Sequence, residues 1–192
     1  RARYRIEYID HHGGRDSVLE ADNVVLAAGT LNTLRILFYS RDVRGGLSGM
    51  PRLGKRFGTN GDFFAYWDYN EPGTDLSQGL PVAGAIQLRD EIDPPTVGGG
   101  GFPSTDAYPL PRPLRNRLKR ANILTGMGED AMDGEVTFAG GKMKIEYEPA
   151  NSPVFARLRA TYEKISHRTG RKAYLPRTPM TVHPTGGACF AA

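Results

Sequence analysis

The sequence is poor in the features that mark several classes of protein. Its one cysteine, Cys189, excludes an internal disulfide framework and a zinc site built from cysteines. Its longest apolar run, residues 24–28, is far shorter than the roughly 20 residues of a membrane-spanning helix. No apolar block follows the basic start, as a signal peptide requires. The sequence therefore predicts no integral membrane segment. Secretion is neither supported nor excluded, and the compartment stays open, with the cytoplasm slightly favoured.

The sequence also has little excess of positive over negative charge. Its 192 residues carry a formal net charge of only +4. The one dense basic patch lies between Arg112 and Arg120. It is compatible with phosphate or membrane contacts, but it lacks the interleaved aromatic side chains on which bases stack. A solvated helix face is the simpler interpretation. The sequence therefore predicts no nucleic-acid partner, and it leaves the oligomeric state open.

The hydrophobic pattern predicts a mixed α and β architecture. Polar and apolar residues alternate over residues 4–8, and strand character resumes at 17–20 after a glycine turn, which predicts a hairpin. The continuous apolar run at 24–29 is typical of a strand buried on both faces. Thr30 then has the chemistry of a helix cap, and residues 31–39 have helical periodicity.

Further along the chain the pattern predicts a mainly antiparallel sheet with one long helix. Residues 44–61 and 93–113 are rich in glycine or proline and predict irregular segments, the second as a long loop. Residues 153–169 predict the clearest helix, with Pro153 at its start and Gly170 after its end. The remaining expected elements are strands at 63–69, 82–88, 123–127, 135–138 and 142–147, and a short helix at 114–121.

Three segments carry residues suited to chemistry, and each also has a plain structural explanation. The run that ends at Gly29 would let a ligand or another backbone approach closely, or it is only a tight turn. Asn60-Gly61 belongs to a glycine-rich segment, 53–62, that is either functional or an ordinary loop. His183 is restricted by Pro184 and followed by Gly186-Gly187, which would leave open space beside its ring. Such a histidine can accept a proton from a bound hydroxyl or merely bond a carbonyl.

Other candidate residues have weaker patterns. His11 and His12 lie in the expected turn, and His167 lies near the end of the long helix, where a cation suits the helix dipole. Glu129, Asp130 and Asp133 do not have the spacing of a calcium loop. The sequence predicts no metal site. The aromatic residues around Trp67 line either an apolar substrate cavity or a core.

Taken together and in this order, the three segments resemble the glucose–methanol–choline oxidoreductase family, and most closely its cholesterol oxidase-like branch. The resembling stretches are 24–37, 53–62 and the His-Pro-Thr-Gly-Gly-Ala-Cys turn at 183–189. The stretch from Met127 to Gly134 is also similar to a strand and turn of that branch. The resemblance spans nearly the whole chain, and the histidine turn is its most specific part.

The resemblance implies an α+β flavoprotein that oxidises the CH–OH group of an alcohol by hydride transfer to FAD, with sterol-like and other apolar alcohols as the candidate substrates. It implies a partial FAD-binding Rossmann-like layer at residues 1–61, an antiparallel-sheet substrate domain with helices at 62–178, and a return to the FAD-binding domain at 179–192. It makes His183 the proton acceptor. The positions that it places near the flavin are Ala28, Gly29, Asn60, Gly61, Gly186 and Gly187.

The chain departs from that family in three ways. It has no G-x-G-x-x-G loop, which lays the pyrophosphate on a helix N-terminus, so we expect that this chain alone does not retain FAD and is inactive. It lacks the Asn-Pro-like segment that follows the histidine turn in the family. Residues 96–103 carry no carboxylate where cholesterol oxidases have a glutamate, which argues against steroid isomerisation and against cholesterol as substrate.

Two functional hypotheses follow. The first is an internal fragment of an FAD-dependent alcohol oxidase or dehydrogenase, because the chain begins within a predicted strand and stops just after a turn. The alternative is a stand-alone, catalytically inactive module that keeps the substrate-binding domain of such an enzyme. Neither the particular alcohol nor the electron acceptor follows from the sequence.

Overall fold

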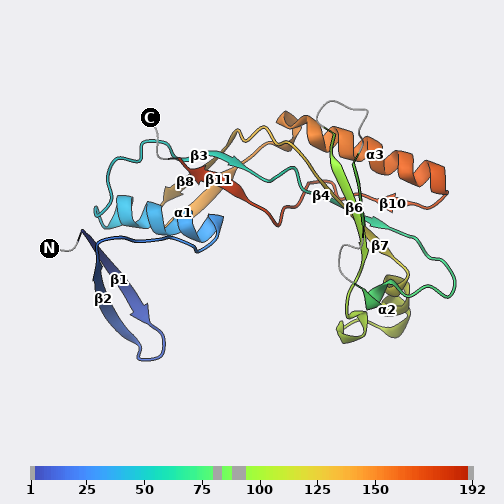
Figure 1. Cartoon of the computed structure of the whole chain (residues 1–192), viewed down its shortest axis with the longest axis horizontal. Coiled ribbons are helices and arrows are strands. Elements are labelled where there is room, and N and C mark those ends of the chain that lie inside the picture. Colours follow the sequence, from blue (N-terminus) through green and yellow to red (C-terminus); the bar gives the residue numbers. More distant parts are fainter. Residues whose placement is uncertain (1–2, 80–83, 88–93, 190–192) are drawn as a thin grey trace.

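The computed structural model describes residues 3–79, 84–87 and 94–189, and it has an α+β fold (Figure 1). Three α-helices accompany three sheets, and every strand pair among the described residues is antiparallel. The predicted mixture of helices and antiparallel sheet is therefore confirmed. The Rossmann-like arrangement of the first section stays a prediction.

The predicted N-terminal hairpin is confirmed. Strands β1 (Tyr4–Asp10) and β2 (Arg15–Ala21) pair in register from Tyr4 opposite Ala21 to Asp10 opposite Arg15. Gly14 adopts a positive φ of 62° in the turn, a conformation that favours glycine. The hairpin projects away from the rest of the chain, and most of its residues are exposed (Figure 1).

The predicted buried strand at residues 24–29 is wrong. This segment pairs with no strand of the described chain, and Val25 is 88% exposed. A central strand needs hydrogen-bonding neighbours on both edges, and no described strand lies beside this one. Its apolar side chains are consequently left on the surface.

Helix α1 (Thr30–Phe38) packs on a four-stranded sheet and forms the first core. Its apolar stripe buries Leu34, Leu37 and Phe38, and a short π-helical turn (Tyr39–Val43) extends it. Its N-cap is Gly29 without a side-chain bond, so the expected cap by Thr30 is wrong. The strand order is β11–β3–β8–β9, with bounds Thr185–Ala188, Leu53–Gly58, Gly134–Ala139 and Lys142–Glu146.

Strand β3 corrects the expectation that residues 44–61 are irregular throughout. Leu53 and Phe57 are buried against α1, and this burial favours an extended conformation that the glycines alone do not predict. The β8–β9 hairpin beside it turns at Gly140-Gly141, as predicted.

The second core forms between a five-stranded sheet and α3 (Pro153–Thr169). The helix has the predicted bounds and ends at Gly170, which adopts the left-handed conformation at φ 65°. Leu158 and Tyr162 are fully buried, and the Tyr162 hydroxyl donates to the Phe63 carbonyl at 2.5 Å. The strand order is β10–β4–β7–β6–β5, with bounds Ala173–Tyr174, Phe63–Trp67, Asn122–Met127, Thr96–Gly101 and Gly84–Gln87.

The short helical elements lie at the periphery. Helix α2 (Arg112–Lys119) carries the basic patch, and part of that charge is paired: Arg117 contacts Asp68 at 2.7 Å and Lys119 contacts Asp106 at 2.7 Å. The described residues also contain three single-turn helices, Leu76–Gln78, Thr105–Ala107 and Pro149–Asn151.

Strand β6 shows that the loop predicted for this part of the chain is wrong. Its four glycines lie in the interior of the sheet. The first residue of the expected loop at 93–113 lies outside the described residues, which resume at Pro94. At two of these glycines, neighbouring atoms lie close to the position of the missing Cβ. A Cβ at Gly101 would overlap the carbonyl oxygen of Leu76, and one at Gly99 would lie 3.3 Å from the Asn122 side chain. At Gly101, therefore, packing requires glycine.

The two sheets meet at the short link between β3 and β4, residues 59–62. Strand β11 pairs with β3, so the segment after residue 179 returns to the sheet that residues 53–58 begin. The β8–β9 hairpin, from the middle of the chain, also joins this sheet. The link therefore lies between the two cores, and it is where the candidate site is found.

We predict that Gly101→Ala lowers the free energy of unfolding by about 1–3 kcal/mol, the usual cost of forcing atoms into a packed site. Gly79→Ala is the matched control, because a Cβ there has no neighbour within 4 Å, and its effect should stay within about 0.5 kcal/mol. Urea denaturation measures both values. Equal stability of the two variants would contradict the packing explanation of β6.

Candidate functional site

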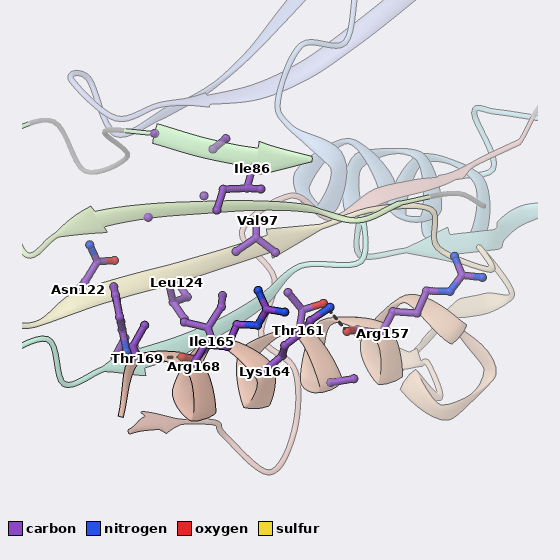
Figure 2. A pocket seen from close by; sticks show the side chains of 16 residues that line it. Ile86, Val97, Asn122, Leu124, Arg157, Thr161, Lys164, Ile165, Arg168 and Thr169 are labelled. Atoms are coloured by element: carbon purple, nitrogen blue, oxygen red, sulfur yellow. Dashed lines mark hydrogen bonds between the residues drawn. The ribbon is translucent and has the colours of Figure 1, made fainter. Parts of the chain in front are cut away.

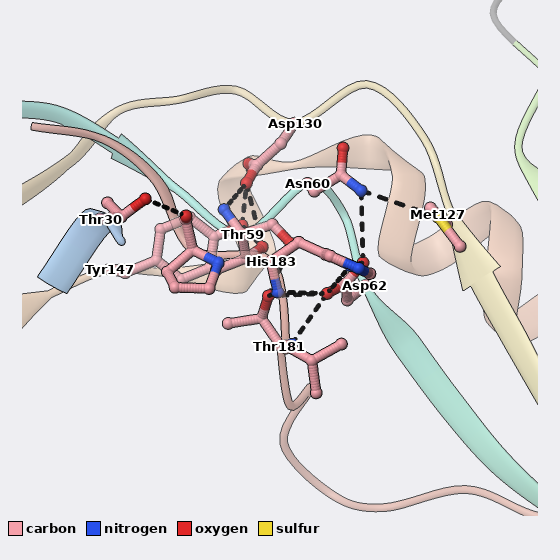
Figure 3. A network of polar contacts seen from close by, with 11 residues as sticks. Thr30, Thr59, Asn60, Asp62, Met127, Asp130, Tyr147, Thr181 and His183 are labelled. Carbon is pink, nitrogen blue, oxygen red and sulfur yellow. Dashed lines mark hydrogen bonds and ion pairs between the residues drawn. The ribbon is translucent and has the colours of Figure 1, made fainter. Parts of the chain in front are cut away.

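The His183 side chain lies on a loop that leads into β11, at the junction of the two sheets (Figure 3). The imidazole is about half exposed, with 53% of its side chain accessible. The loop is tied to helix α1 because the Thr30 hydroxyl donates to the Pro184 carbonyl at 2.6 Å. Two of the predicted segments, the α1 entry and the histidine turn, are thereby brought together.

A buried carboxylate, Asp62, holds this loop in place. The side chain of Asp62 is 1% exposed. Its Oδ2 accepts hydrogen bonds from the Thr181 hydroxyl at 2.7 Å and from the backbone N–H groups of Val182 and His183 at 3.0 and 3.1 Å. The Nδ1 atom of His183 lies 3.0 Å from the same oxygen and 3.1 Å from Oδ1. Asn60 adds a weak contact from its side-chain amide at 3.5 Å.

These contacts keep Asp62 ionised. Burial raises the pKa of this carboxyl, but hydrogen bonds from Thr181, His183 and the Val182 backbone, together with the charge of a protonated His183, outweigh burial and hold the pKa below its ordinary value. The group is therefore an anion at neutral pH, compensated by donors rather than by water.

The ionised state of Asp62 determines the tautomer of the neutral imidazole. A carboxylate has only acceptor positions, so the Nδ1 atom of His183 must carry the proton that it shares with Asp62. The lone pair of the neutral ring then resides on Nε2, which no hydrogen bond from the described residues engages. The arrangement can orient an imidazole and leave Nε2 available as a proton acceptor.

A second buried carboxylate, Asp130, fixes the other side of the link. It accepts from the Thr59 backbone N–H at 2.5 Å, the Ser152 hydroxyl at 2.6 Å and the Tyr147 hydroxyl at 2.8 Å. Burial raises the pKa of Asp130, but these hydrogen bonds together lower it below the ordinary value. The hydrogen bond from Ser152 has the largest lowering effect. The Thr181 hydroxyl also lies 2.9 Å from the Thr59 carbonyl, so its single proton is shared between that carbonyl and Asp62, and this sharing connects the two networks.

The glycines of the predicted site have structural reasons for their identity. A Cβ at Gly61 would lie 2.7 Å from the Gly128 carbonyl oxygen, and one at Gly187 would lie 2.7 Å from Leu34. A Cβ at Gly186 would overlap the carbonyl oxygen of Arg56. The expectation that Gly186-Gly187 leaves open space beside the imidazole stays a prediction, because these close approaches concern the positions of the missing Cβ atoms and not the space beside the ring. A contact of these backbones with FAD stays a prediction.

Ala28, Gly29 and Asn60 remain accessible. Ala28 and Gly29 are exposed at the start of α1, and no atom lies within 4 Å of a Cβ built on Gly29. Asn60 is exposed and adopts a positive φ of 59° beside Asp62. These three positions are open to a ligand, and the first N–H groups of α1 have no intrahelical partner.

One face of the five-stranded sheet continues from the site. The side-chain amide of Asn60 contacts the Met127 sulfur at 3.7 Å. Leu124 and Gly126 face α3, so alternation along β7 places Ile123, Thr125 and Met127 on the opposite face. Thr125 is buried there, and its hydroxyl lacks a hydrogen-bond partner in the described chain. This face thus combines apolar side chains with one unpaired hydroxyl.

A scan against known protein-family models finds no match, and a search of curated proteins finds no relative of significant similarity. Within the described residues, no group of three or more His, Cys, Asp or Glu side chains could hold a metal ion, and no helix is both long and apolar enough to span a membrane. The functional interpretation of the candidate site therefore rests on the geometry of its residues.

Sequence reasoning found His183 but missed the two carboxylates. Asp62 and Asp130 both lie in stretches that resemble the family, and Asp130 was otherwise considered only as a calcium ligand, for which its spacing does not fit. The one usable signal was the adjacency of Asp62 to Asn60-Gly61, because a turn pair next to a carboxylate often precedes a local hydrogen-bond network. The contact with His183 joins residues 121 positions apart and has no local signature.

The lowered pKa of Asp62 predicts a pH-dependent contribution to stability. A folded-state pKa below the unfolded value of about 3.9 stabilises the protein above that value, and the stabilisation is lost as the pH falls through the folded pKa. We therefore expect Asp62→Asn to lower the free energy of unfolding at pH 7 by about 1–3 kcal/mol.

Chemical denaturation at pH 7, 5, 4 and 3 measures this effect. The difference between wild type and Asp62→Asn should narrow toward the acid end of the series. Asp16→Asn, on the exposed hairpin, is the matched control and should differ little from wild type at any pH. A difference that is constant from pH 7 to pH 3 would contradict an ionised Asp62.

Proposed function

We propose that this chain contributes the proton acceptor and part of the substrate surface of an FAD-dependent alcohol oxidoreductase. The main observation in support of this proposal is the half-exposed imidazole of His183, whose Nδ1 lies 3.0 Å from the buried carboxylate of Asp62. A base oriented in this way, with a free Nε2, suits removal of a proton from a hydroxyl group. The proposal agrees with the family that the sequence resembles.

The roles of the residues follow from the chemistry of an alcohol. Nε2 of His183 accepts the hydroxyl proton, and the negative charge that develops on the alcohol oxygen makes the carbinol hydrogen a better hydride donor. Asp62 stabilises the imidazolium that forms, since its carboxylate is already ionised and in contact with Nδ1. FAD, when bound, supplies the acceptor for that hydride. A ketone or an aldehyde is the product.

The residues present fit part of a flavin site. The open Gly29 and Ala28 precede the free N–H groups of α1, and the exposed Asn60 lies beside Asp62. Backbone donors of this kind suit the polar edge or phosphates of a cofactor. The G-x-G-x-x-G loop is missing from the sequence, so the residues of this chain would hold only one side of FAD.

The exposed apolar segment at 24–26 supports a larger flavoprotein. Val25 is 88% exposed in a stretch whose composition is that of a buried parallel strand. Additional strands of an FAD-binding layer would cover it and supply its missing hydrogen bonds. The proposal therefore includes a partial Rossmann-like layer completed by other residues.

The proposed substrate is an apolar alcohol. Ile123 and Met127 lie on the sheet face that continues from Asn60, and Phe64 pairs with Thr125 on the same face. An apolar body placed along this face would bring a terminal or ring hydroxyl toward His183. Strand β6 has no carboxylate, so no residue there would catalyse steroid isomerisation.

The alternative function is a catalytically inactive substrate-binding module, which the missing glycine loop favours. The two proposals differ in their response to FAD. A module would bind an apolar alcohol without FAD, whereas a flavoprotein segment would bind it productively only when the cofactor layer is complete.

In the complete flavoprotein that the proposal requires, His183→Ala should lower kcat by about 10²–10⁴-fold, the usual contribution of a general base. His167→Ala, an exposed position on α3, is the matched control and should leave turnover unchanged. Steady-state alcohol oxidation with FAD bound measures both. Full turnover after His183→Ala would overturn the assigned role.

Asp62→Asn tests the positioning role in the same assay. We expect a loss of about 10–100-fold in kcat with a smaller change in KM, because Asp62 orients the base. The pH–rate profile should change as well, because the substitution removes the carboxylate charge 3.0 Å from Nδ1. A uniform loss with an unchanged pH profile would indicate a purely structural role.

A further inference from the structure

A large groove lies on the other face of the five-stranded sheet, between that sheet and α3 (Figure 2). Its volume is about 900 Å³, within the range of about 300–1,000 Å³ of small-molecule sites. Its apolar part is formed by Trp67, Ile86, Val97, Leu124 and Ile165. Since Leu124 and Met127 lie on opposite faces of β7, the groove is separate from the surface next to His183.

The helical wall of the groove is basic. Arg157, Lys164 and Arg168 all line it, and their spacing of seven and four residues places them along one stripe of α3. The single acidic residue of the helix, Glu163, lies outside this stripe and outside the lining. In the part of the chain that the structure describes, no ion pair engages Lys164 or Arg168.

The described lining contains no carboxylate to balance the charge of Lys164 and Arg168. Its remaining polar side chains are neutral, among them Asn122 and Thr161. Figure 2 shows apolar side chains of the sheet, such as Val97 and Leu124, facing the helix that carries the cations. The groove thus pairs an apolar surface on one side with positive charge along the other.

We propose that this groove binds an amphipathic anion, a long-chain carboxylate whose hydrocarbon lies against the sheet and whose head group pairs with Lys164 and Arg168. The apolar side chains favour the hydrocarbon chain because its burial removes apolar surface from water. The two cations favour the head group because their charge meets no described carboxylate in the lining. This inference does not depend on the proposed redox function.

The only tryptophan of the chain, Trp67, lines the groove and serves as an intrinsic reporter. Sodium dodecanoate, titrated below its micelle-forming concentration, should change the Trp67 fluorescence in a saturable way. Raising the salt concentration should weaken binding, because part of the attraction is electrostatic. The neutral 1-dodecanol should bind at least about tenfold more weakly, because it has the same chain without the charge.

A charge reversal tests the head-group contact. Lys164→Glu/Arg168→Glu should raise the Kd for dodecanoate at least about tenfold, and both positions are exposed, so the fold should tolerate the change. Arg112→Glu, a charge reversal on α2 outside the groove, should leave the Kd unchanged. Circular dichroism confirms that each variant is folded.

Three results of the dodecanoate titrations would overturn the proposal. They are the absence of a saturable Trp67 signal, equal affinities for dodecanoate and 1-dodecanol, and an unchanged Kd in the charge-reversed variant. Binding only to anionic phospholipid vesicles, with none to dodecanoate, would also overturn it and would assign the basic stripe to a membrane surface. Saturable binding with the expected charge and salt dependence supports it.

Discussion

The carboxylate of Asp62 is ionised although water scarcely reaches it, and the candidate site depends on how that charge is compensated. Burying an anion costs several kcal/mol unless hydrogen bonds replace its hydration. Here the hydroxyl of Thr181, two backbone N–H groups and the His183 ring provide the replacement. The need to satisfy Asp62 therefore holds residues 181–183 against the link between the two sheets. The imidazole is fixed as a consequence.

A second buried carboxylate makes the arrangement rigid. Asp130 holds the backbone of Thr59 from the opposite side, and the Thr59 carbonyl receives the Thr181 hydroxyl. The link thus lies between two anions whose hydrogen-bond networks meet at Thr59 and Thr181. Removal of either anion leaves buried donors without an acceptor, so the two networks should be coupled in stability as well as in geometry.

The sequence predicted the elements whose signals are local. Helix α3 was predicted to its end residues because Pro153 and Gly170 mark its ends and its apolar residues follow the helical period. The hairpins were predicted from alternation and glycine turns. The glycines of β6 were misread as a loop, because their compatibility with a strand depends on Leu76 and Asn122, which approach only in the folded chain.

The remaining errors have the same origin in distant contacts. Residues 24–29 have the composition of a central strand, but no described strand pairs with them. At Gly186 and Gly187, Arg56 and Leu34 occupy the space that a Cβ would need, a packing requirement that the local sequence does not show. His183 was predicted as a candidate base from its own turn, yet its partner Asp62 lies 121 residues away and no local pattern joins them. Composition indicates which residues tolerate a conformation, and packing decides which conformation forms.

The two faces of the five-stranded sheet carry different chemistry. One face continues from Asn60 through Met127 and is close to the site. The other forms the groove under the basic stripe of α3. The sheet thus separates a candidate reaction surface from a candidate binding groove, so each can be altered without touching the other.

The protonation pattern of the neutral His183 ring tests the central claim most directly. Long-range ¹H–¹⁵N NMR correlation spectra of the ¹⁵N-labelled chain, recorded at a pH where the imidazole is neutral, distinguish the two ring nitrogens. With Asp62 as an acceptor-only carboxylate, Nδ1 should carry the proton and Nε2 should show the shift of an unprotonated nitrogen. A predominant Nε2–H tautomer would contradict the account, because His183 would then present a donor where the proposed chemistry needs an acceptor.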